Sequence, residues 1–185
     1  MRETWRSVDE ALAWAYRVAA GDIIKLSSLG KMRGAERQSS EATPHEIHAQ
    51  AAIMMAHVQR LRDVLQAYVH ARYWPAMRDQ SSVDESYRAA MGILVRATIG
   101  ALGTGVHSAR AVHVCIAQYF ERGESRSFQG VHWVQREARC RKATALEMRR
   151  AVWDSLDALQ GRAWVILEDE MRGAGLLADP ESPSP

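Results

Sequence analysis

Residues 128 to 163 read FQGVHWVQREARCRKATALEMRRAVWDSLDALQGRA, and this stretch decides the fold. Apolar residues recur every three or four positions in its second half: Ala145, Met148, Val152, Leu156, Leu159 and Ala163. This spacing places them on one face of an α-helix. The stretch predicts a helix of about ten residues that ends at Ala138, a polar joint from Arg139 to Ala143, and a long closing helix that Thr144 can cap. Two helices joined in this way form a helix-turn-helix.

Helical spacing continues through most of the chain, and no run of alternating β-branched residues competes with it. Ser7, Thr43 and Ser82 each precede a glutamate by three positions, which is the spacing of a capping box at a helix start. The glycines between residues 100 and 105 indicate a helix break. The sequence therefore predicts an all-α protein of six to eight helices, with a C-terminal helix-turn-helix and a long closing helix.

Length limits the number of domains. A chain of 185 residues can fold as one domain and bury roughly 70% of its extended surface. A polar link at residues 75 to 82 leaves room for two helical parts. We expect an N-terminal helical part at residues 1–74 and a helix-turn-helix part at residues 83–178. The prolines and serines of residues 179–185 predict a disordered tail.

The composition argues against several classes of protein. The N-terminus lacks the apolar run of a signal peptide, and no stretch of 18 apolar residues occurs, so neither secretion nor a membrane span is expected. Two cysteines, Cys115 and Cys140, are too few for a disulfide framework, which favours the reducing cytoplasm. No pattern assembles a nucleophile, a base and an oxyanion donor, so we do not expect an enzyme.

The seven histidines do not follow a recognised metal-binding spacing. His45, His48 and His57 lie on or near one predicted helix, without the H-E-x-x-H pattern of a zinc site, and surface or packing positions explain them. The other ligand types between residues 107 and 132 would form a site only if folding brought them together. The sequence therefore predicts no metal and no cofactor.

Positive charge is concentrated around the helix-turn-helix. The whole chain carries only +2, but residues 121 to 150 contain eight basic and four acidic residues, whereas residues 151 to 185 contain two basic and seven acidic residues. A clustered basic face is what contact with nucleic-acid phosphates requires. The start of the second helix, which faces base edges in a bound helix-turn-helix, offers Arg141, Lys142, Thr144, Glu147 and Arg149. The alternative is a solvated arginine-rich surface that pairs with the acidic C-terminal segment.

Three short stretches resemble a known family. They are AAIMMAHVQRL at residues 51–61, AYVHARY at residues 67–73, and IAQYFERG at residues 116–123, before the helix-turn-helix. Together they look like the Q-type late-gene antitermination proteins of lambdoid phages. The Tyr-Phe-x-x-Gly element, with the helix-turn-helix and closing helix that follow it, is also similar to the promoter-binding region 4 of bacterial sigma factors. The likeness covers residues 44–73 and 110–165.

The resemblance implies binding to double-stranded DNA near a phage late promoter, inside the cytoplasm of a bacterial host. It also implies engagement of host RNA polymerase and its sigma factor, and conversion of the polymerase to a terminator-resistant form. The DNA-binding residues would be Arg136, Arg139, Arg141, Lys142, Thr144, Arg149 and Arg150. Some members of the family carry a zinc site, and this chain lacks the cysteines for one.

Two other roles stay open from the sequence. One is a helical phage interaction protein that inhibits a host factor. Residues 164 to 167 are all apolar, which is too wide for one core stripe, so part of the final helix is expected to face a partner. The other is a small DNA-packaging (terminase) subunit, which shares a helix-turn-helix but would form a large ring.

Overall fold

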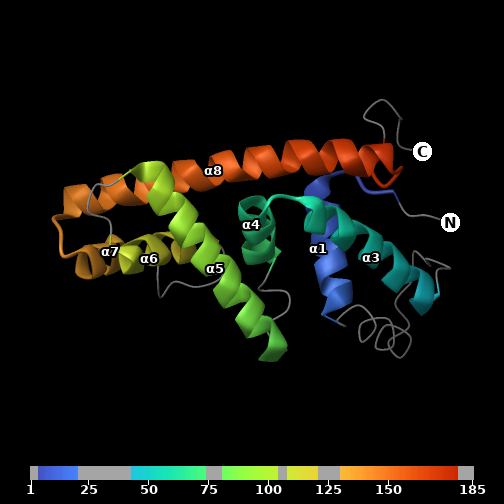
Figure 1. Cartoon of the computed structure of the whole chain (residues 1–185), viewed down its shortest axis with the longest axis horizontal. Coiled ribbons are helices and arrows are strands. Elements are labelled where there is room, and N and C mark those ends of the chain that lie inside the picture. The colour runs from blue at the N-terminus through green and yellow to red at the C-terminus, as the bar shows by residue number, and fades with distance from the viewer. Residues whose placement is uncertain (1–3, 21–42, 74–80, 104–107, 121–129, 179–185) are drawn as a thin grey trace, which may run out of the picture. The chain divides into compact units, whose positions relative to one another are not determined.

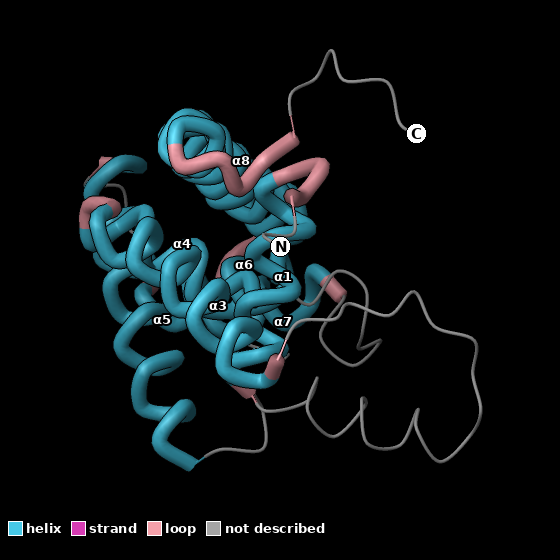
Figure 2. Tube along the Cα trace, turned by 90° about the vertical axis from the view of Figure 1, so that its right-hand side faces the viewer, coloured by secondary structure: helices cyan, strands magenta, loops and turns pink. Residues whose placement is uncertain are grey.

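The computed structural model describes residues 4–20, 43–73, 81–103, 108–120 and 130–178 of the chain. Seven helices account for the regular secondary structure of these residues (Figures 1 and 2), and no sheet occurs among them. They are α1 (Val8–Ala19), α3 (Pro44–Arg60), α4 (Asp63–Tyr73), α5 (Ser81–Leu102), α6 (Ala109–Phe120), α7 (Val131–Ala138) and α8 (Lys142–Gly173). The predicted all-α class of six to eight helices is confirmed.

Two of the predicted caps are present at helix starts, but only the one at Thr43 is a complete capping box. The Thr43 hydroxyl accepts a hydrogen bond from the Glu46 N–H at 3.3 Å, and the Glu46 carboxylate accepts one from the Thr43 N–H at 2.7 Å, which completes a capping box. These hydrogen bonds lower the pKa of Glu46. Ser7 caps α1, but the Glu10 carboxylate bonds the N–H of Arg6 rather than that of Ser7.

One expectation for α5 needs correction, and the other is confirmed. The helix begins at Ser81, so Ser82 lies inside it and does not start it. The helix continues through Gly100 and ends at Leu102, so the predicted break between residues 100 and 105 is confirmed. Gly103 follows with a φ of 80°, a conformation that glycine adopts without a steric penalty. The break therefore comes at the second of the three glycines, because a helix tolerates one exposed glycine at a modest cost.

Contacts divide the chain into two compact units whose segments alternate along the sequence. Unit 1 contains Met1–Leu61, Tyr73–Asp84 and Trp164–Pro185, and unit 2 contains Arg62–Arg72 and Glu85–Ala163. The two consecutive parts expected from the sequence, residues 1–74 and 83–178, stay a prediction. The expected tail lies outside the described residues.

Unit 1 is built where α1 packs against α3 and where the end of α8 joins them. His57 of α3 contacts Glu170 of α8, with 2.9 Å between Nδ1 and Oε2. The N–H of Trp5 donates to the carbonyl of Leu176 at 2.9 Å, and the N–H of Ala178 donates to the carbonyl of Trp5 at 2.8 Å. These bonds attach the chain before α1 to the chain after α8.

Unit 2 holds the first part of α8 against α4 and α6 through part-buried polar contacts. The Tyr119 hydroxyl donates to Asp157 at 2.5 Å, and the Tyr68 hydroxyl donates to Gln160 at 2.9 Å. Burial, and then the hydrogen bond to Asp157, raise the pKa of Tyr119. The Trp153 indole donates to the backbone carbonyl of Cys115 at 3.0 Å. The three bonds hold α8 at different points along its length, at Trp153, Asp157 and Gln160. Together they fix the rotation of α8 about its axis and its position along that axis.

Candidate nucleic-acid interface

The predicted sequence of short helix, joint and long helix is present at residues 131 to 173, with different bounds. The short helix α7 has eight residues and begins at Val131, and residues 121–129 before it lie outside the described residues. It packs against α6, and the Gln118 amide of α6 donates to the carbonyl of Gly130 at 3.2 Å. Val134 is its one fully buried side chain, and His132 and Arg136 are its exposed ones.

The joint is only three residues long, Arg139 to Arg141, and it contains a left-handed residue. Arg139 ends α7 with φ 50° and ψ 43°, and its N–H donates to the carbonyl of Gln135. The joint contains no glycine, so a residue with a side chain occupies this left-handed position. A residue with a Cβ atom pays roughly 1–2 kcal/mol for this conformation.

Replacing Arg139 with glycine is therefore expected to raise the free energy of unfolding by about 1 kcal/mol. Arg139→Ala is the matched control, because alanine removes the same charge but keeps the Cβ atom. Urea unfolding followed by circular dichroism measures both. A glycine variant no more stable than the alanine variant would show that the left-handed residue is not strained.

The long helix starts earlier than predicted, so Thr144 is not its cap. The carbonyl of Arg141 accepts the hydrogen bond from the N–H of Ala145 at 3.0 Å, which makes Arg141 the residue before the first turn. Thr144 is the third residue of α8, and its side chain is exposed. The first turn contains no acidic residue. Its N–H groups, with the positive end of the helix dipole, can therefore bind an anion such as a phosphate.

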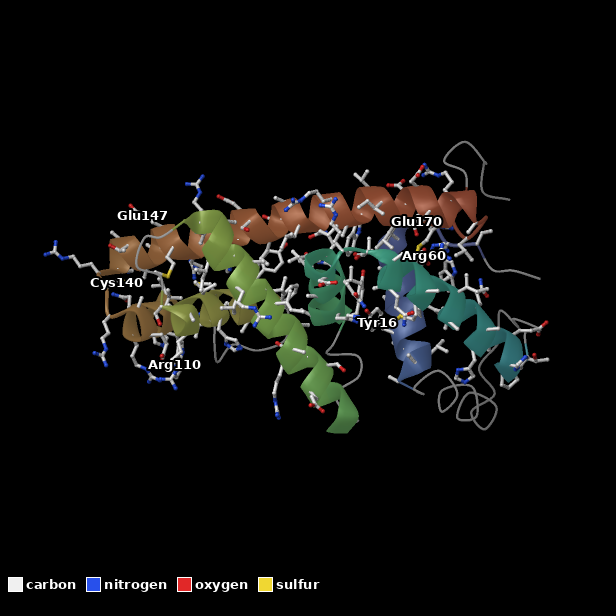
Figure 3. All side chains as sticks on the ribbon, viewed as in Figure 1. Tyr16, Arg60, Arg110, Cys140, Glu147 and Glu170 are labelled. Atoms are coloured by element: carbon white, nitrogen blue, oxygen red, sulfur yellow. The ribbon has the colours of Figure 1, made fainter. Side chains whose placement is uncertain are left out.

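Most of the side chains predicted to bind DNA are exposed. We call five of them the basic surface: Arg136, Arg139, Arg141, Lys142 and Arg150. Thr144 is exposed beside them. In Figure 3 the joint lies near the label of Cys140, at the end of unit 2 where α7 turns into α8. The structure thus brings the charges of α7, the joint and α8 to one end of this unit.

Ion pairing does not neutralise this surface within the described residues. Arg136 lies 3.5 Å from Glu137, its neighbour in sequence. Arg139, Arg141 and Lys142 form no ion pair and no side-chain hydrogen bond with any described residue. The alternative in which these side chains pair with the acidic residues of the closing helix is therefore not observed in the described part of the chain.

Two arginines lie over tryptophan rings, with different consequences. The guanidinium carbon of Arg136 lies 4.4 Å from the centre of the Trp133 ring, and the side chain stays 66% exposed. Arg149 lies 4.9 Å above the Trp153 ring and is only half-buried rather than exposed. Stacking on an indole restricts the motion of a guanidinium group, but its N–H groups stay at the rim of the guanidinium plane, where they can still donate hydrogen bonds. Arg149 therefore belongs to the contact between α8 and α6 more than to the basic surface.

The sequence interpretation missed two exposed residues of the same unit. Leu146 is 40% exposed and lies one turn after Lys142 and one turn before Arg150, so the three share a strip of α8. The spacing of four residues between them was visible in the sequence. Arg110 is exposed in the first turn of α6, the helix that packs on α7, and is labelled in Figure 3. Nothing in the local sequence indicated that it would lie in the same unit.

Glu147 limits the positive charge of this strip, because it is exposed one residue after Leu146.

Among the described residues, no three histidine, cysteine or acidic side chains come close enough to hold a metal ion. Burial raises the pKa of the Cys115 thiol to about 12, so this thiol stays protonated at neutral pH. The exposed cations of the basic surface can bind anions.

Comparison with known protein families, curated proteins and solved structures gives no match for this chain. The likeness to Q-type antitermination proteins consequently stays a prediction from short sequence stretches. None of the described helices combines the length and the apolar character that crossing a bilayer demands.

Proposed function

We propose that this chain binds double-stranded DNA through the basic surface and acts as a transcription regulator. The observation that carries the proposal is the exposure of Arg139, Arg141 and Lys142 without an acidic partner among the described residues. An exposed arginine elsewhere on α8, Arg172, does have such a partner, since it bonds Glu168 at 2.7 Å. Unpartnered cations in a row, next to a helix N-terminus without acidic residues, favour contact with phosphates.

The order of the elements supports DNA over other polyanions. In a helix-turn-helix the first residues of the second helix face base edges in the major groove, and flanking cations contact the backbone. Here Lys142, Thr144 and Leu146 are exposed in the first two turns of α8. They offer a cation, a hydroxyl and an apolar group, which are groups that distinguish base edges.

Antitermination is the finer part of the proposal, and it rests on the resemblance of residues 44–73 and 110–165 to the Q-type proteins. In this account the protein acts in the cytoplasm of a bacterial host by binding, and not by catalysis. It binds near a late promoter, engages RNA polymerase and the sigma factor, and makes the polymerase pass terminators.

A transcription assay tests this role. Duplexes that the protein retains from a random pool supply its preferred site, which is then placed between a promoter and an intrinsic terminator. Purified bacterial polymerase with its sigma factor transcribes this template with and without the protein. We expect readthrough of the terminator to rise several-fold in the presence of the protein. The matched control is the same template with the selected site scrambled.

Different results would reject DNA binding and antitermination. Selective retention of duplexes with unchanged readthrough would reject antitermination and leave DNA binding in place. Failure to retain any duplex at low salt would reject both levels, because the basic surface would then not bind DNA.

A further inference from the structure

An exposed face near the end of α8 has apolar residues at its centre and opposite charges at its ends. Val165 is 70% exposed and Ile166 is 39% exposed, whereas the neighbouring Leu167 is fully buried. Arg162 lies three residues before Val165, and Asp169 lies three residues after Ile166, both exposed. The four residues are spaced i, i+3, i+4 and i+7, so they share one face of the helix. We call them the RVID face.

Among the described residues, Arg162 and Asp169 form no ion pair with each other or with any other charged side chain. The Arg162 Nε–H donates to the carbonyl of Ala158 at 3.2 Å, one turn earlier on the same helix. Asp169 has no ion pair and no hydrogen bond with any described residue. The nearby Glu168 is occupied, because it pairs with Arg172 at 2.7 Å. Each face therefore presents one cation and one anion with a pair of aliphatic side chains between them.

This pattern is complementary to itself. If two α8 helices pack antiparallel with a two-fold axis between Val165 and Ile166, each Val165 faces the Ile166 of the other copy. The same axis places each Arg162 opposite the Asp169 of the other copy. A two-fold contact of this kind uses the same patch on both subunits and closes on itself. Gly161 also has no heavy atom within 4 Å of an added Cβ, so the helix surface is open for close approach.

We propose that the RVID face is a docking site for a second copy of this chain, which forms an antiparallel α8 pair. The charge order selects this partner, because Arg162 and Asp169 are matched only when the second helix carries the same order in the opposite direction. The face is small, so the dimer is weak, with a dissociation constant on the order of tens of micromolar. This inference does not depend on DNA binding.

Sedimentation velocity of the nucleic-acid-free protein, from about 5 to about 500 micromolar, tests the proposal. We expect wild type to pass from monomer to dimer over this range. Arg162→Glu and Asp169→Arg should each weaken the dimer at least tenfold, because each places like charges opposite one another. An equimolar mixture of these two variants should dimerise like wild type, since in the mixed pair both contacts join opposite charges.

Two further variants separate the RVID face from general effects. Val165→Ser removes only apolar surface from an exposed position, so it should weaken the dimer while circular dichroism stays unchanged. Arg60→Glu, on an exposed arginine of α3, makes the same charge reversal elsewhere and should leave the dimer intact. A wild-type monomer at every concentration would overturn the proposal. So would a dimer that neither charge variant weakens, or a mixture that stays monomeric.

Discussion

Leu156→Ala is expected to lower the free energy of unfolding by about 3–5 kcal/mol. Leu156 is fully buried in α8, on the face that also buries Val152 and Leu159. Removal of three carbon atoms leaves a cavity between helices that part-buried hydrogen bonds from Trp153 and Tyr119 hold in position. Because these bonds limit how far the helices can close around the gap, the cost should lie at the upper part of the usual range.

The matched control for this prediction lies on the same helix. Leu146→Ala makes the same substitution at a position that is 40% exposed, and it should change stability by only about 0.5 kcal/mol. Chemical unfolding in urea, followed by helical circular dichroism, measures both variants. Equal losses for the two variants would contradict the assignment of the buried and exposed faces of α8.

The second large effect concerns the joint between α7 and α8. Arg141→Ala combined with Lys142→Ala should lower the affinity for duplex DNA at least tenfold at physiological salt, because two phosphate-binding cations are lost. Both side chains are exposed and have no ion pair within the described residues, so their removal should not unfold the protein. Fluorescence anisotropy with a labelled duplex measures the affinity, and thermal unfolding checks the fold.

The control for this variant is the loss of the same charge elsewhere. Arg60→Ala combined with Arg62→Ala removes two exposed arginines from the end of α3 and the residues after it. If binding depends on the basic surface, this control should bind DNA almost as tightly as wild type. Equal loss in both double variants would mean that net charge, and not position, determines binding.

The sequence was sufficient to predict the helices, because their apolar residues repeat with the period of an α-helix. Val152, Leu156 and Leu159 are all buried as that period requires. The capping box at Thr43 was also predictable, since it depends on side chains three residues apart. Local spacing carries this information without any knowledge of tertiary contacts.

The joint was less predictable, because its conformation depends on how α7 is held. Arg139 adopts a left-handed conformation that its residue type disfavours, while α7 packs against α6 and its start is bonded by Gln118. A similar limit applies to Arg149, which the sequence grouped with the other cations. Arg149 lies over Trp153, which is four residues later on the same helix, but only the structure shows that the Trp153 indole bonds the Cys115 carbonyl of α6.

The sequence likewise could not predict which acidic and basic residues pair with one another. The last third of the chain contains a basic and an acidic segment, which allows either mutual neutralisation or separate surfaces. In the structure Asp157 accepts a bond from Tyr119 and Glu170 contacts His57, so two of those acidic residues have partners outside the basic surface. This arrangement leaves the cations of the joint exposed.

The salt dependence of DNA binding tests the central claim most directly. The dissociation constant for a labelled duplex of about 20 base pairs is measured by anisotropy in a series of salt concentrations, for wild type and for a variant with alanine at positions 139, 141 and 142. We predict a linear increase of log Kd with log salt for wild type, and a slope lower by about 0.9 for each removed phosphate contact in the variant. No binding by wild type at low salt, or equal slopes for the two proteins, would contradict the account.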